Sequence, residues 1–120
     1  MRWTHEDVTT YLRLVRDNLA SGVIPEERLQ MTTVASRGRC GTVACIGGWM
    51  ILLRGPKKAW DYRGIELVHE LDNILHAYNR ERDTRGRLDR LFHEYPDYVS
   101  SADAVTAIDR FLGGVEPWTQ

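Results

Sequence analysis

The middle of the chain carries the feature that most constrains its fold, an uninterrupted apolar run with the sequence VACIGGWMILL at residues 43–53. As a helix, this run has apolar or small residues on every side and no polar face to turn to water. It is too short to cross a bilayer as a helix. We therefore expect a buried central helix over about residues 42–54, capped by Thr42, with a buried strand as the alternative.

Two glycines, Gly47 and Gly48, lie inside this run. Each lowers helix propensity by about 1 kcal/mol relative to alanine. Glycine is tolerated at such positions when a neighbouring segment must approach closely. We therefore expect another backbone to pack against these two residues.

Amphipathic spacing predicts the helices that surround this run. Apolar residues recur every three or four positions over residues 5–21 and about 65–79, which is typical of helices with one buried face. Thr4 and Asp7 form a capping-box pair at the start of the first helix, and Gly22 suits its end. Shorter helices are expected at Pro25–Met31, around Leu88–Phe92 before Pro96, and from a Ser100 or Ser101 cap to Gly113.

These segments predict an all-α fold, a compact orthogonal bundle of four to five helices around the central helix. Residues 32–41 show no helical period and are expected to form a loop. With 120 residues, 42% hydrophobic and 28% charged, the chain fits one helical domain over residues 1–120 that folds unaided.

The charge balance bears on partners and location. Sixteen basic residues face seventeen acidic ones, so no overall field draws the protein to nucleic acid or to an anionic membrane, and neither is expected as a partner. The first eight residues, MRWTHEDV, resemble neither a secretory signal nor a transit peptide. The sequence thus predicts a cytoplasmic protein.

The run CGTVACIGGWM at residues 40–50 resembles a recurring element of small bacterial and phage proteins. Those proteins share Cys-Gly-Thr, two variable residues, a second cysteine and a helix rich in small residues. The resemblance extends weakly from Met31 to the last predicted helix. It implies a compact helical fold and an origin in a phage or mobile element, and because that group has no established activity it assigns no catalytic or binding residue.

The two cysteines, Cys40 and Cys45, are too few for a disulfide scaffold. Cys40 precedes the predicted central helix, where a helix dipole lowers a thiol pKa, so it is the candidate reactive thiol. Cys45 is expected one turn inside that helix, as inert packing. Four intervening residues without a second pair do not match a zinc motif, and the sequence predicts no metal and no cofactor.

His69, Asp72 and His76 fall along one border of the predicted helix at residues 65–79. Such a row suits a metal or a proton relay, but it is also the ordinary place for polar residues on an amphipathic helix. His5 and His93 have no comparable neighbours and are expected to face solvent.

An arginine-rich segment at residues 80–90 is the candidate binding surface. Five arginines accompany three acids there, and guanidinium groups grip phosphate or carboxylate bidentately. A solvated charged face is the alternative interpretation. The arginines of this segment are Arg80, Arg82, Arg85, Arg87 and Arg90.

Four tryptophans are many for this length. Trp49 is expected in the core. Trp3, Trp60 and Trp118 are expected to close the core over its ends, with partner contact as the alternative, and Trp60 is the tryptophan included in the candidate binding surface.

No catalytic triad, carboxylate pair or nucleotide-binding motif is present in the sequence. We therefore expect a non-enzymatic binding protein, with a host protein or a small anionic ligand as its partner and a homo-oligomer as a possible assembly. A phage origin would suit interference with a host process such as a defence system. The alternative is a small thiol- or metal-dependent enzyme that uses Cys40 with His69 or His76.

Overall fold

The first helix, α1 (His5–Ser21), begins and ends where the sequence predicts. The Thr4 hydroxyl accepts a hydrogen bond from the Asp7 amide, and the Asp7 carboxylate accepts one from the Thr4 amide, which completes the capping box. Gly22 ends the helix with a φ of 82°, a left-handed conformation that favours glycine. Local capping chemistry therefore sets both ends of this helix.

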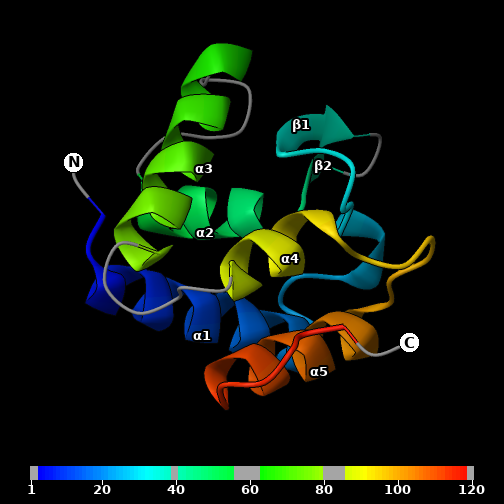
Figure 1. Ribbon diagram of the computed structural model, residues 1–120. Helices are drawn as coiled ribbons and strands as arrows, with labels where there is room; N and C mark the ends of the chain where they lie inside the picture. Colours follow the sequence, from blue (N-terminus) through cyan, green and yellow to red (C-terminus); the bar gives the residue numbers. More distant parts are fainter. Residues whose placement is uncertain (1–2, 39–40, 56–62, 80–85, 119–120) are drawn as a thin grey trace.

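The all-α class predicted from the sequence is confirmed (Figure 1). The computed structural model describes residues 3–38, 41–55, 63–79 and 86–118. Besides α1, its helices are α2 (Ile46–Arg54), α3 (Gly64–Asn79), α4 (Arg87–His93) and α5 (Ser101–Leu112), with one 3₁₀ turn, η1 (Glu26–Arg28). Among these described residues, no helix is both long and apolar enough to span a membrane.

The central helix starts later than predicted. Residues 42–44 belong to strand β2 (Gly41–Ala44), which pairs antiparallel with β1 (Ala35–Gly38), so the predicted loop contains a strand. Thr42 is therefore not the helix cap; Cys45 is. Hydrogen bonds to the preceding segment explain the difference, because the Gln30 amide donates to the Ala44 carbonyl and the Cys45 amide donates to the Thr33 carbonyl. The apolar run thus divides into a short strand and a helix.

The second predicted helix is also shorter than expected. Residues 26–28 form η1, and Leu29 already has an extended backbone. A single isolated bridge joins Leu29 to Ala44 in parallel, so this segment contributes to the edge of the hairpin. Pairing with β2 therefore replaces the continuation of the helix to Met31.

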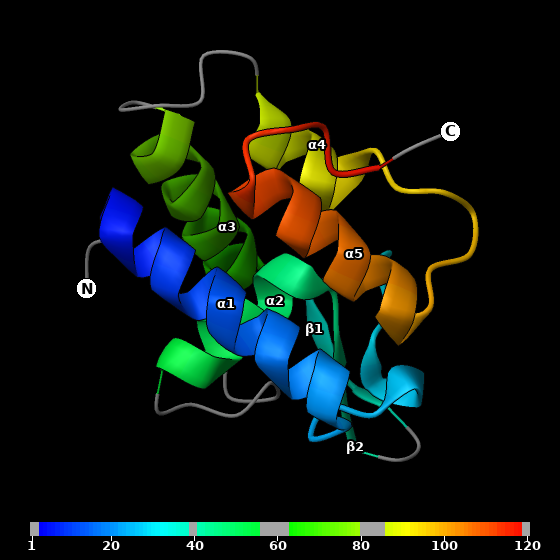
Figure 2. The same cartoon turned by 90° about the horizontal axis from the view of Figure 1, so that it is seen from below.

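Helix α2 lies at the centre of the core, as predicted. Ile46 and Met50 are fully buried, and α2 packs against α1 and α3 (Figure 1). Figure 2, seen from below, shows α1 and α5 side by side, and these two helices share the most extensive contacts among the described elements. Apolar faces of four helices thus close around α2 and form one core.

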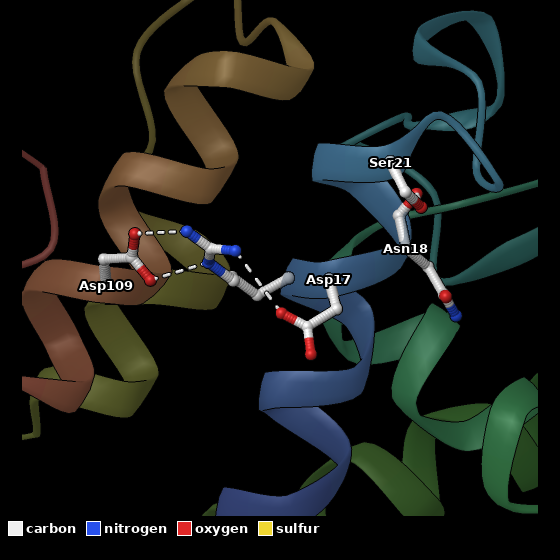
Figure 3. Close-up of polar contacts among 5 residues, drawn as sticks. Asp17, Asn18, Ser21 and Asp109 are labelled. Carbon is white, nitrogen blue, oxygen red and sulfur yellow. Dashed lines mark hydrogen bonds and ion pairs between the residues drawn. The ribbon is translucent and has the colours of Figure 1, made fainter.

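An arginine also links α1 to α5 at the surface. The Arg16 guanidinium donates two hydrogen bonds to the Asp109 carboxylate, at 2.9 and 3.1 Å, and lies 3.3 Å from Asp17 (Figure 3). The hydrogen bond with Asp109, and then its charge, raises the pKa of Arg16. The link therefore remains charged across the physiological pH range.

A close backbone contact explains the glycine at residue 48. A Cβ atom added to Gly48 would lie 1.4 Å from the Val34 carbonyl oxygen. At Gly47 the nearest atoms are instead side-chain carbons of Leu71, at 2.4 Å, and Phe92, at 3.3 Å. The predicted close approach of another backbone is thus confirmed at Gly48, whereas Gly47 makes room for side chains.

We expect Gly48→Ala to destabilise the fold at or beyond the upper end of the roughly 1–3 kcal/mol typical of overpacking, because the obstructing atom belongs to the backbone. Gly113→Ala is the matched control, since Gly113 has a φ of −80° and its nearest neighbour to an added Cβ is 3.4 Å away. Urea denaturation of both variants checks this. Equal stability of the two variants would contradict the close contact.

Candidate functional site

The segment between α4 and α5 is irregular and exposes several large side chains. Helix α4 ends at His93, and α5 begins at Ser101 after its cap, Ser100, which forms a second capping box with Asp103. Pro96 lies between them and has no amide proton to continue a helix. Tyr98 is 71% exposed. Two helix ends and a proline therefore define a short surface loop, residues 94–99, which forms an outward bulge in Figure 2.

A hollow of about 400 Å³ lies between this loop and η1, and we name it the acidic pocket. Glu26 links its two sides, because its carboxylate accepts hydrogen bonds from the Ser101 amide at 3.0 Å and the Tyr98 hydroxyl at 3.5 Å. The pocket is lined by Glu26, Glu27, Leu29, Gln30, Met31, Thr32, Tyr95, Pro96, Asp97, Tyr98 and Val99. Segments distant in sequence thus form one concave surface.

A second hollow, of about 580 Å³, lies on the other side of the loop, and we name it the tail pocket. Tyr95 and Pro96 line both pockets, so the two hollows meet at this dipeptide. The tail pocket is lined by Arg90, Glu94, Tyr95, Pro96, Glu116, Pro117 and Trp118. We call the surface formed by both linings the loop face.

The C-terminal segment, residues 113–118, is tied to α4 and α5 by directed contacts. Arg90 donates two hydrogen bonds to the Glu116 carboxylate, and Arg87 donates one to the Gly114 carbonyl at 3.0 Å. Arg110 donates to the Glu116 carbonyl at 2.8 Å. The Trp118 indole donates to two α4 carbonyls, each at 3.2 Å. One wall of the tail pocket is therefore the chain's own C-terminal segment.

The predicted arginine surface divides into two parts. Arg80, Arg82 and Arg85 lie outside the described residues. Arg87 and Arg90 lie on α4 and hold the C-terminal segment, where Arg90 pairs with Glu116. A role of these arginines in partner binding stays a prediction. Arg90 also lines the tail pocket, so this prediction concerns the loop face.

Cys45 is a buried free thiol at the start of α2, not one turn inside it as predicted. Its sulfur accepts a hydrogen bond from the Gly48 amide at 3.3 Å and lies 3.9 Å from the Val34 carbonyl, to which the thiol donates. Burial raises the pKa of Cys45 in spite of these backbone contacts. Cys45 therefore caps α2 as a neutral thiol, while Cys40, the candidate reactive thiol, lies outside the described residues.

The histidine row on α3 is exposed. His69, Asp72 and His76 all face solvent, and within the described part of the chain no group of three or more His, Cys, Asp or Glu side chains could hold a metal ion. His5 is half-buried and stacks on Tyr78 with ring centroids 4.5 Å apart, so its predicted exposure is wrong. His93 is exposed as expected and contacts Asp89.

The tryptophans mostly complete the core. Trp3 is buried, donates a hydrogen bond to Glu70 at 2.9 Å and carries the Arg54 guanidinium over its ring. Trp118 is half-buried against the core, and so is Trp49, which was expected in the core. Trp60 lies outside the described residues. Trp3 therefore closes the core, whereas Trp118 also lines the tail pocket.

Comparison of the chain with protein-family models, with curated proteins and with solved structures finds no match. The function is therefore argued from the geometry of the chain itself.

Sequence reasoning missed most of the loop face. The string EYPDYV at residues 94–99 places two tyrosines, a proline and two acids between predicted helices, a composition that favours an exposed binding loop. That signal was available. The contribution of η1 and of the C-terminal segment was not, because it depends on how distant segments pack.

Alkylation of the native protein should modify Cys45 more slowly than a free peptide thiol at pH 8, because the thiolate reacts and the buried thiol keeps its proton. Peptide mapping after timed alkylation checks this rate, with Cys40 followed separately and expected to react no faster than a free thiol.

The stability of the protein should also depend on the protonation of Cys45. The folded thiol has the higher pKa, so its contribution to the free energy of unfolding is fully present below the ordinary thiol pKa and declines as the pH rises past about 8.5. Loss of this high-pH decline in Cys45→Ala checks the prediction.

The Arg90–Glu116 pair should contribute modestly to stability, since both side chains are partly exposed. A double-mutant cycle with Arg90→Ala and Glu116→Ala should give a coupling of about 0.2–1 kcal/mol that shrinks with added salt. Thermal denaturation at low and high salt measures it. A coupling of several kcal/mol would mean that the C-terminal segment is integral to the core.

Proposed function

We propose that the protein is a non-enzymatic binding protein and that it binds another protein through the loop face. One observation carries the proposal: two neighbouring hollows meet at Tyr95 and Pro96. A partner segment that crosses this dipeptide can insert one side chain into each pocket. A compact small molecule would occupy only one of them.

The composition of the loop face supports protein binding. Tryptophan, tyrosine and arginine dominate the energetics of protein interfaces, and the loop face includes Trp118, two tyrosines and Arg90. Pro96 is exposed and adds rigid apolar surface, because its ring limits the backbone freedom lost on binding. The surface is therefore rich in the anchors that partners use.

A small anionic ligand, the other candidate partner, is less well supported. Arg87 and Arg90 already donate hydrogen bonds to the C-terminal segment, so an anion would have to displace Glu116 from Arg90. The enzyme alternative has little support from Cys45, because burial keeps that thiol protonated. These considerations favour a protein partner.

The biological role that we propose is based on the resemblance of residues 40–50 to small phage and bacterial proteins. A phage or mobile-element accessory protein that interferes with a host process, such as a defence system, would act by binding a host protein in the cytoplasm. The free thiol of Cys45 agrees with a reducing compartment. A homo-oligomer would be compatible with this activity, and the near-neutral charge disfavours nucleic acid as the partner.

Photo-crosslinking tests the surface. A photoreactive phenylalanine analogue is placed at Tyr98 or, as the control, at Ile65 on α3, which is 61% exposed and lines neither pocket. We expect a discrete crosslinked partner in host lysate from position 98 only. The partner is then purified and titrated. Equal crosslinking from both positions would contradict the proposal.

Tyr95→Ala should weaken binding of that purified partner by about 30-fold, as expected for an interface anchor worth about 2 kcal/mol. Ile65→Ala should leave the affinity unchanged. Calorimetric titration measures both, with helical circular dichroism as the control for folding. Unchanged affinity of a folded Tyr95→Ala variant would remove the loop face as the binding surface.

A further inference from the structure

The acidic pocket has a one-sided charge. Three carboxylates, those of Glu26, Glu27 and Asp97, line it, and among the residues whose side chains the structure describes no lysine, arginine or histidine does. The molecule as a whole is nearly neutral, so this imbalance is local. A hollow that gathers negative charge attracts a positively charged group.

The three carboxylates differ in what they already bind. Glu26 is occupied, because it accepts hydrogen bonds from the first turn of α5 and from Tyr98. Glu27 and Asp97 are exposed and make no hydrogen bond or ion pair with any residue in the described parts of the chain. Two carboxylates at the rim are thus available to a ligand.

Aromatic rings also belong to the lining of the acidic pocket, beside the polar side chains of Gln30 and Thr32. Tyr95 and Tyr98 line the pocket, and the bond to Glu26 orients the Tyr98 ring although it is 71% exposed. Aromatic faces attract cations, guanidinium groups most often. Between them, Leu29, Met31 and Val99 offer apolar contact for an aliphatic stem. Carboxylates, aromatic rings and an apolar floor together match the parts of an arginine side chain.

We propose that the acidic pocket binds an arginine side chain of the partner protein. This inference rests on the proposed function and specifies the chemistry of its partner. Arginine suits the pocket better than lysine, because its planar group stacks on tyrosine and bonds two carboxylates at once. The next side chains of the same segment cross Tyr95 and Pro96 towards the tail pocket.

The probe is a blocked pentapeptide, Ala-Ala-Arg-Ala-Ala, titrated into ¹⁵N-labelled full-length protein and followed by NMR. We expect amide shifts confined to residues 26–32 and 95–99. The citrulline peptide, which keeps the shape and loses the charge, should bind at least about 10-fold more weakly. Equal binding of the two peptides, shifts elsewhere, or no shift with the arginine peptide at about 20 mM would each overturn the proposal.

Variants identify the groups involved. The double change Glu27→Gln and Asp97→Asn should weaken the arginine peptide by about 5- to 10-fold, and Tyr98→Ala by about 2- to 5-fold. Glu6→Gln with Asp72→Asn is the matched control, since it removes two exposed carboxylates that line neither pocket. Equal loss in the control would mean that only the overall charge matters. Glu26 is left intact because it supports the start of α5.

The two proposals fail in different ways. If position 98 crosslinks a partner but arginine and citrulline peptides bind alike, the loop face stands and the arginine inference is wrong. If the arginine peptide binds the pocket but no protein crosslinks there, the protein partner is wrong, and free arginine or a polyamine becomes the ligand to titrate.

Discussion

The contact between Gly48 and the Val34 carbonyl is the constraint on which the rest of the fold depends. Two further contacts join the same two segments: the Cys45 amide donates to the Thr33 carbonyl at 2.7 Å, and the Cys45 thiol donates to the Val34 carbonyl. Within α2, the Cys45 sulfur also accepts a hydrogen bond from the Gly48 amide. The positive end of a helix favours nearby carbonyl oxygens. A glycine at position 48 lets one of them reach the first turn of α2, which fixes the buried helix against the hairpin.

The position of the loop face depends on the same part of α2. Gly47, the preceding residue of α2, leaves space that Leu71 of α3 and Phe92 of α4 fill. Phe92 is two residues before the loop, so its packing against α2 holds the end of α4 next to the loop. Core residues thereby position the side chains that line the acidic pocket and the tail pocket.

The sequence allowed helix ends to be predicted where the signal was local. The capping box at Thr4, the cap at Ser100 or Ser101 and the left-handed Gly22 each depend on residues within a few positions. All three are confirmed, with Ser100 as the cap of α5. The hairpin was missed because apolar residues such as Val43 and Ala44 suit a buried strand as well as a buried helix. Its formation is decided by hydrogen bonds to Gln30 and Thr33.

The same distinction applies to the candidate site. The arginines were found because they are close together in sequence, but Arg90 pairs with Glu116, which is 26 residues away. The acidic pocket joins η1 to the loop after α4, a separation of about 70 residues that no local pattern encodes. Only Tyr95, Pro96 and their neighbours carried a signal of their own.

Helix α4 has only seven residues, too few to be stable alone, so tertiary contacts must hold it. The C-terminal segment supplies several of them, through the carbonyls that Trp118 binds and the side chains of Arg87 and Arg90. These two arginines therefore support the loop face from within. The sequence suggested that they bind a partner directly. Their contacts point to a different contribution, in which they hold the C-terminal segment, the wall of the tail pocket against which a partner segment would lie. A basic segment of the partner would then meet the free carboxylates of the acidic pocket, and the charge complementarity would be the reverse of the one expected from the arginines alone.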